Sequence, residues 1–175
     1  MPYCLIALLP LLIAPLDPEN TQLPMPHLKL IALDVEDLAI ISAHLQDAVL
    51  KVSDLAFLPR EKKFAAVANR FDWMDAIEQD GARDKRYARR RTALRFERVL
   101  SAQVQGLNLK DESAVAELLA IRFEPGDPPQ GQVTLDFAGG GAIRLNVECI
   151  EAELRDLGPV WQAKSRPKHP DESPR

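Results

Sequence analysis

Cysteine, histidine and glycine are scarce in this sequence. Its 175 residues include two cysteines, three histidines and eight glycines. Cys4 and Cys149 stand too far apart in the chain to suggest a disulfide framework, and no group of cysteines and histidines has the spacing of a zinc site. We therefore expect no metal and no cofactor, and this cysteine usage is typical of a protein of the reducing cytoplasm.

The sequence also lacks a long hydrophobic run and any early positive charge. The apolar stretch 5–14 is too short to span a bilayer as a helix, and no Lys or Arg precedes Lys29, which disfavours a secretory signal. Residues 15–26 are rich in proline, and Met25 precedes the first convincing element. We predict that residues 1–24 are a disordered extension or follow from a mis-assigned start, with an export signal as the alternative.

Hydrophobic residues make up 46% of the chain and charged residues 27%, enough apolar side chains for the core of one domain. We place this domain at residues 25–162. Residues 163–175 are polar, charged and rich in proline, which predicts a disordered tail. The formal net charge of -4 implies by itself neither a nucleic-acid partner nor a membrane.

Residues 29–33 are typical of a short strand, and Asp34 then stands where a helix N-cap is expected. Apolar residues repeat at helical spacing from Leu38 to Leu45 and predict a helix over 35–48. Residues 49–58 and 64–71 are rich in apolar residues and flank a Pro-containing turn, which predicts a hairpin.

Apolar residues then alternate with polar ones, as in antiparallel strands covered on one face. The expected strands are 92–104, 119–123, 133–137 and 143–147, with a hairpin turn at residues 139–141. Ile150, Leu154 and Leu157 return to helical spacing, and Gly158 is suited to end a helix over 148–157.

The predicted fold class is α+β. A short strand and a helix come first, followed by about six mostly antiparallel strands that a C-terminal helix closes. This order of elements is similar to that of the pleckstrin-homology-like superfold, by analogy alone. A flatter α+β sandwich with both helices on one face is the alternative.

Several long stretches resemble one known family. They are LKLIALDVEDLAIISAHLQDAVLKV from Leu28, RRRTALRFERV from Arg89, LLAIRFEPGDPP from Leu118 and GQVTLDFAGGGAIRLNVECIEAELRDLGPVW from Gly131. The family is an uncharacterised alphaproteobacterial one, domain of unknown function 2948. It implies a start near Met25 but no activity, cofactor or catalytic residue.

The most distinctive feature is a basic segment from Arg83 to Arg98, with eight positive and two negative residues. Its net charge is +6, which leaves -10 for the rest of the chain. Arginine forks bind phosphate or carboxylate groups in a bidentate manner. The candidate anion-binding residues are Arg86, Arg89, Arg90, Arg91 and Arg95. The alternative is a solvated segment whose charges meet nearby acids.

Other candidates have structural interpretations. Arg98 is expected on the apolar side of its strand, where it would need an acidic partner. A catalytic histidine needs a nucleophile and an orienting group beside it, and no residue spacing in the sequence links such groups to His44. We therefore predict no catalytic site there. Glycines 139–141 precede a strand and not a helix, which favours a turn over a phosphate loop. The PGDPPQG loop at residues 125–131 is expected to be a turn that could line a groove.

The resulting functional hypothesis is a non-enzymatic binding module that engages an anionic partner through the arginine segment. An acidic protein or a phosphorylated ligand fits this chemistry. Nucleic acid is a less favoured partner that stays open. Two alternatives stay open: an enzyme or enzyme accessory acting on a small metabolite, which would need a closed pocket, and a purely structural subunit.

Overall fold

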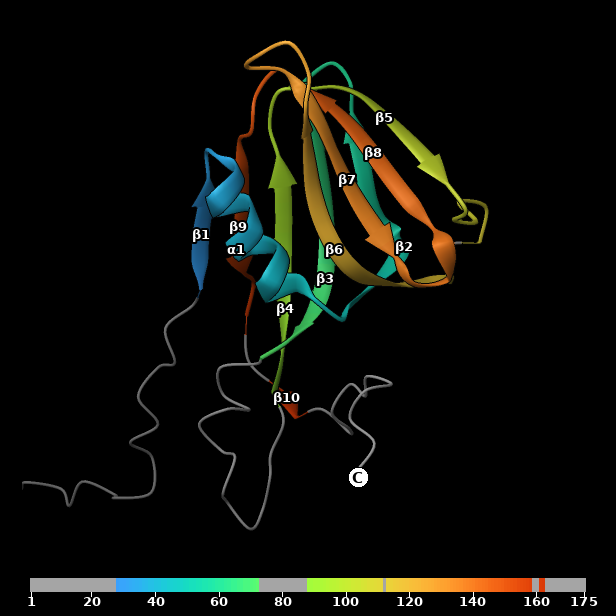
Figure 1. Ribbon diagram of the computed structural model, residues 1–175. Helices are drawn as coiled ribbons and strands as arrows, with labels where there is room; N and C mark the ends of the chain where they lie inside the picture. The colour runs from blue at the N-terminus through green and yellow to red at the C-terminus, as the bar shows by residue number, and fades with distance from the viewer. Residues whose placement is uncertain (1–27, 73–87, 112, 159–160, 163–175) are drawn as a thin grey trace, which may run out of the picture.

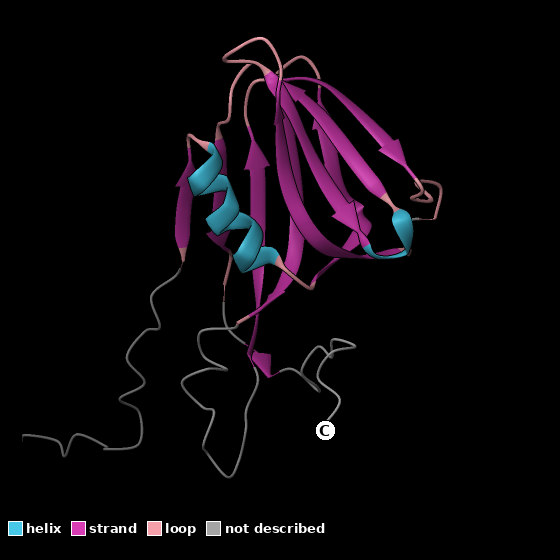
Figure 2. Ribbon diagram, in the orientation of Figure 1, coloured by secondary structure: helices cyan, strands magenta, loops and turns pink. Residues whose placement is uncertain are grey.

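The computed structural model describes residues 28–72, 88–111, 113–158 and 161–162, which form a protein made mostly of sheet (Figures 1 and 2). These residues contain one α-helix, α1 (Val35–Leu45), and a short 3-10 turn, η2 (Ala138–Gly140). The strands are β1 (Lys29–Ala32), β2 (Ala48–Leu58), β3 (Lys63–Phe71), β4 (Ala88–Phe96), β5 (Val99–Gln105), β6 (Val115–Pro125), β7 (Gly131–Phe137), β8 (Ala142–Val147), β9 (Ala152–Asp156) and β10 (Trp161–Gln162).

Every strand pair in this sheet is antiparallel. The strand order is β1-β9-β4-β3-β2-β6-β7-β8-β5, and β10 pairs with β4 outside this path. The sheet is therefore open, with β1 at one edge and β5 at the other. The strand β9 is inserted between β1 and β4, although it lies about 120 residues after β1 in the chain.

One hydrophobic core serves both halves of the sheet. Phe96 and Leu154 enter it from the half that contains β4 and β9, and Leu135 and Leu145 enter it from β7 and β8. These four side chains are at most 1% exposed. Because a flat sheet cannot place both halves around one core, the sheet must curl.

The helix α1 lies across the curled sheet between β1 and β6 (Figure 1). Its N-terminus is capped by Asp34, whose side chain accepts a hydrogen bond of 2.8 Å from the Asp37 N–H. Leu38, Ile41 and Leu45 repeat at helical spacing and are buried against the sheet. The hydroxyl of Ser42 accepts a hydrogen bond from the Ile121 N–H and so joins the helix to β6.

The predicted fold class is wrong. The described chain is mostly sheet, its α-helix lies near the N-terminal end, and no helix closes the C-terminal end of the described domain. The analogy with the pleckstrin-homology-like superfold and the α+β sandwich both fail for this reason.

The predicted helix over residues 148–157 contains β9 instead. Ala152 and Leu154 are buried, whereas Leu157 is 50% exposed, so the period of burial is two and not 3.6. The sequence suggested a helix because Asp156, a charged residue, occupies the next inward position and hides the alternation. Its burial is explained by the ion pairs described below.

The predicted strand over residues 92–104 is two strands, β4 and β5, joined by a turn at Glu97 and Arg98. The turn contains neither Gly nor Pro, and Arg98 itself takes the left-handed conformation with φ of 57°. Arg98 was expected on the apolar side of its strand, but it is exposed and donates a hydrogen bond of 3.0 Å to Glu151.

Other expectations are confirmed. The helix begins at Val35, β2 and β3 form a hairpin, and glycines 139–141 join β7 to β8. Gly139 and Gly140 have φ of 79° and 81°, values that favour glycine. The predictions for residues 1–24 and 163–175 concern parts of the chain outside the described residues.

Candidate anion-binding site

The strand β4 carries most of the arginines that the sequence singled out, and its alternation divides them between two faces. Arg90 points inward with Thr92 and is 4% exposed. Arg89, Arg91 and Arg95 stand at the odd positions, on the opposite face of the sheet. Arg86 lies outside the described residues. The predicted cluster is therefore not one site, since Arg90 is separated from its neighbours by the sheet itself.

Arg90 belongs to a buried group of five polar side chains, which we call the inner ion-pair network: Arg70, Asp72, Arg90, Thr92 and Asp156. Arg70 donates to both carboxylate oxygens of Asp156, from Nε at 3.0 Å and from Nη2 at 2.9 Å. Arg90 Nε donates to Asp72 Oδ2 at 2.5 Å. The Thr92 hydroxyl donates to Asp156 Oδ1 at 2.9 Å. Each arginine is thus neutralised by an aspartate, and Arg90 is not free to bind an external anion.

Strand register explains how the network forms. Arg70 on β3 lies directly opposite Arg90 on β4, and Thr92 lies opposite Asp156 on β9. Two like charges directly opposite each other would destabilise the sheet, so the aspartates are needed between them. Asp72 directly follows β3 and supplies the second carboxylate.

The surroundings of Asp156 lower the pKa of its carboxyl group below the usual range. Burial alone would raise this pKa, but the hydrogen bonds and positive charge of Arg70, together with the Thr92 hydroxyl and the Leu28 N–H, outweigh it. The carboxylate is therefore ionised at neutral pH and completes the bidentate pair.

His44 faces this network from the last turn of α1. Burial of the imidazole lowers its pKa, and the positive charge of Arg70 lowers it further, while Asp72 and Asp156 act in the opposite direction. His44 is therefore neutral at pH 7. The sequence predicted no catalytic site at His44, and this stays a prediction.

The opposite, outer face of β4 and β9 carries exposed positive charge. Arg91 and Arg155 are both exposed, and neither lies within 4 Å of a carboxylate of the described residues. Lys29 lies directly opposite Arg155, and its side chain is 54% exposed. Arg89 lies over the Phe71 ring at 5.9 Å and donates to the Asn69 carbonyl at 3.3 Å. We call Lys29, Arg89, Arg91 and Arg155 the basic face.

The basic face ends towards Arg95. There Arg95 lies 3.1 Å from Glu97 and 3.4 Å from Glu153, and Lys29 is 3.9 Å from the same Glu153 carboxylate. These exposed pairs neutralise the charge at that end of the strands, although each contributes little stability. On this face Arg91 and Arg155 are the exposed arginines that have no carboxylate within 4 Å among the described residues.

Sequence reasoning found Arg89 and Arg91 but missed Arg155 and Lys29. These two residues are far from the arginine segment in the chain, and the strand order alone brings them beside it. The inner network had a signal that could have been found: Ala66, Ala68, Arg70 and Asp72 occupy successive inward positions, so the last two had to be buried and paired.

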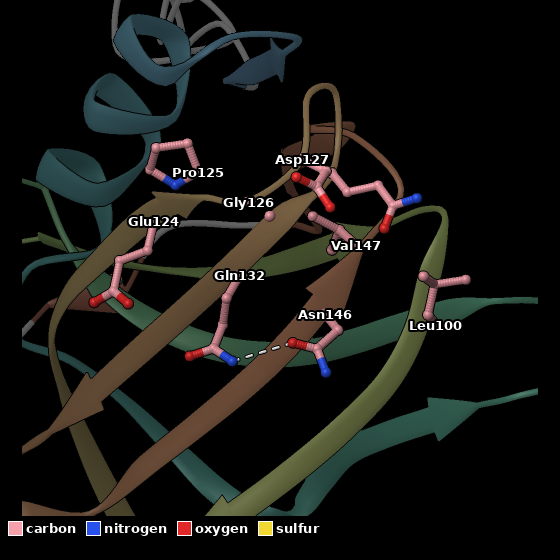
Figure 3. A pocket seen from close by; sticks show the side chains of 10 residues that line it. Leu100, Glu124, Pro125, Gly126, Asp127, Gln132, Asn146 and Val147 are labelled. Carbon is pink, nitrogen blue, oxygen red and sulfur yellow. Dashed lines mark hydrogen bonds between the residues drawn. The ribbon is translucent and has the colours of Figure 1, made fainter.

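A second polar surface lies at the hairpin of β6 and β7, where the PGDPPQG loop borders a groove of about 320 Å³ (Figure 3). On the sheet that forms its floor, Gln132 Nε2 donates to Asn146 Oδ1 at 3.1 Å. Asn146 in turn donates to the Ser101 hydroxyl at 2.9 Å. Glu124 and Asp127 also line the groove, so its charge disfavours an anion. The groove is open to solvent along the sheet and does not overlap the basic face.

Among the described residues, no group of three or more His, Cys, Asp or Glu side chains is arranged to hold a metal ion. In the same part of the chain no helix has the length and apolar character needed to cross a bilayer.

Comparison with known proteins gives a family and no function. No curated protein and no solved structure matches the chain. One family model, described as protein of unknown function (DUF2948), matches residues 28–169, which include all of the described strands. The resemblance noted from the sequence is thereby confirmed, and this chain belongs to the family described as protein of unknown function DUF2948.

Proposed function

We propose that this protein is a non-enzymatic binding module of the cytoplasm that engages an anionic partner through its basic face. The observation that carries the proposal is the pair of exposed guanidinium groups, Arg91 and Arg155, which have no carboxylate partner among the described residues. Elsewhere on this sheet Arg70, Arg90, Arg95 and Arg122 are each paired with a carboxylate, and Arg144 donates to the Gln105 side chain.

The positions of these cations suit one ligand. Arg155 pairs with Ala93, so it is one strand over and two residues along from Arg91. Diagonal neighbours of this kind are about 7–8 Å apart at their Cα atoms, within reach of two long side chains on one bound group. Lys29, directly opposite Arg155, extends the row to a third strand.

The same arrangement lowers the stability of the protein when no anion is bound. Like charges directly opposite each other on neighbouring strands destabilise a sheet, and Lys29 and Arg155 are such a pair. An anion bound between them would remove the repulsion. A carboxylate-rich or phosphorylated partner should therefore bind more tightly to this face than to a surface of evenly mixed charges.

The alternative, an enzyme acting on a small metabolite, would use the groove of Figure 3. The polar side chains on its floor already bond to one another: the Gln132 amide donates to Asn146, and the Asn146 amide donates to the Ser101 hydroxyl. This arrangement supports a rigid sheet surface and leaves the basic face as the stronger candidate.

The first test compares two double variants that remove the same charge. The probe is a fluorescein-labelled peptide of eight glutamates, measured by anisotropy in about 50 mM salt. The variant R91Q/R155Q is expected to bind at least about tenfold more weakly than the wild type, equal to about 1.4 kcal/mol. The control R122Q/R144Q, which alters β6 and β8, should stay within about twofold of the wild type, because those residues already bond to Asp136 and Gln105. Equal weakening by both variants, or no binding by the wild type, would contradict the proposal.

A further inference from the structure

The edge strand β1 lies next to the basic face and presents unpaired backbone groups. β1 is the terminal strand of the sheet and pairs with β9 alone among the described strands. The Asp156 N–H donates to the Leu28 carbonyl at 2.9 Å, so Leu28 belongs to a hydrogen-bonded position of the antiparallel ladder. Such positions alternate along a strand. Leu30 and Ala32 therefore also face β9.

The intervening residues, Lys29 and Ile31, direct their N–H and C=O groups away from β9, towards the open edge. No hydrogen bond from these groups to another described residue is present. An extended segment placed alongside could form up to four backbone hydrogen bonds with these two residues. Addition of a strand to an exposed sheet edge is a common mode of peptide recognition.

Side chains around the edge define what such a segment would contain. On the outer face the edge presents Lys29, beside Arg155, and Ile31, which is 54% exposed. On the inner side Ile40 of α1 is 52% exposed. Ile40 stands on the flank of the helix opposite Ser42, the residue that contacts β6, and so on the side of β1.

We infer that the partner is an extended peptide segment in which acidic and apolar residues alternate, and that it adds to the sheet antiparallel to β1. Its residues opposite Lys29 and Ile31 project onto the outer face, where carboxylates reach Lys29 and the guanidinium of Arg155. Its intervening residues project inward, where apolar side chains cover Ile40 of α1. This inference rests on the proposed function, since it names the partner of the same basic face.

Charge distinguishes this edge from the other one. The opposite edge strand, β5, carries Gln103 and Gln105 on its outer face. Arg144 of β8, which lies opposite Gln103, donates to the Gln105 side chain at 2.8 Å and is already engaged. An acidic segment therefore gains from β1 a charge interaction that β5 does not offer.

The test uses peptides in place of protein variants, so the folding of β1 is not disturbed. The probe is an acetylated hexapeptide of alternating glutamate and valine. In antiparallel pairing with β1, the residues opposite Lys29 and Ile31 direct their N–H groups towards the edge, and these are the glutamates. N-methylation of the glutamate amides removes those hydrogen bonds. N-methylation of the valine amides, which point away from β1, is the matched control.

We expect the glutamate-methylated peptide to bind at least about tenfold more weakly than the parent, and the valine-methylated peptide to stay within about threefold of it. Equal effects of the two methylated peptides would overturn strand addition. If the parent still loses affinity for R91Q/R155Q in that case, the proposed function survives without the edge. If the parent binds the wild type and R91Q/R155Q alike, the proposed function fails and the inference fails with it.

Discussion

Replacing Arg70 with methionine is expected to destabilise the protein by about 3–5 kcal/mol, because the change leaves the Asp156 carboxylate buried without its bidentate partner. The side chain of Asp156 is fully buried, and that of Arg70 is 4% exposed. The hydroxyl of Thr92 and the N–H of Leu28 would still contact the carboxylate, but neither carries a positive charge. Urea unfolding followed by circular dichroism measures the loss.

The control is the double variant R70M/D156L, which removes both charges and leaves Arg90 paired with Asp72. Apolar side chains of similar volume commonly replace a buried ion pair at little or no cost. We expect the double variant to regain most of the stability lost by R70M. A double variant as unstable as R70M, or an R70M protein within about 1 kcal/mol of the wild type, would show that the pair has no such role.

A second large effect is expected at β9. Leu154→Ala should lower the free energy of unfolding by about 2–5 kcal/mol, because Leu154 is fully buried and the change leaves a cavity. Leu157→Ala should change the free energy of unfolding by less than about 0.5 kcal/mol, because that side chain is 50% exposed. Thermal or urea unfolding of the two variants gives the comparison.

This contrast distinguishes the strand from the helix that the sequence predicted. In a helix over residues 148–157, Leu154 and Leu157 would share one buried face, and both substitutions would be costly. Similar large losses for the two variants would therefore argue against the register of β9 with β4.

The parts of the fold that the sequence predicted correctly are local ones. Asp34 and the spacing of Leu38, Ile41 and Leu45 define α1 through interactions within a few residues. Gly139 and Gly140 define the turn between β7 and β8 through their own backbone preferences. No distant contact is needed for either.

The failures occur where a distant partner changes the preference of a residue. Asp156 belongs to a strand because Arg70, 86 residues earlier, pairs with it, and without that partner the sequence is typical of a helix. Arg98 has a left-handed backbone conformation, which is otherwise typical of glycine or asparagine. Its hydrogen bond to Glu151 across the neighbouring turn accompanies that conformation.

Only the local part of the candidate site could be predicted from the sequence. The charge of the arginine segment is evident from composition, and strand alternation could have separated Arg90 from Arg89 and Arg91. The contribution of Arg155 and Lys29 could not be predicted, because it depends on β9 lying between β1 and β4. Strand order of this kind follows from the packing of the whole core and not from any short segment.

The most direct test of the basic face as the binding surface is a titration of ¹⁵N-labelled protein with the alternating glutamate–valine hexapeptide, followed by two-dimensional NMR. The predicted result is that the amide signals of residues 29–32 and of Arg91 and Arg155 shift most, while those of Gln132 and Asn146 in the groove of Figure 3 stay unchanged. Shifts concentrated at that groove or along β5, with the signals of Arg91 and Arg155 unmoved, would contradict the proposal.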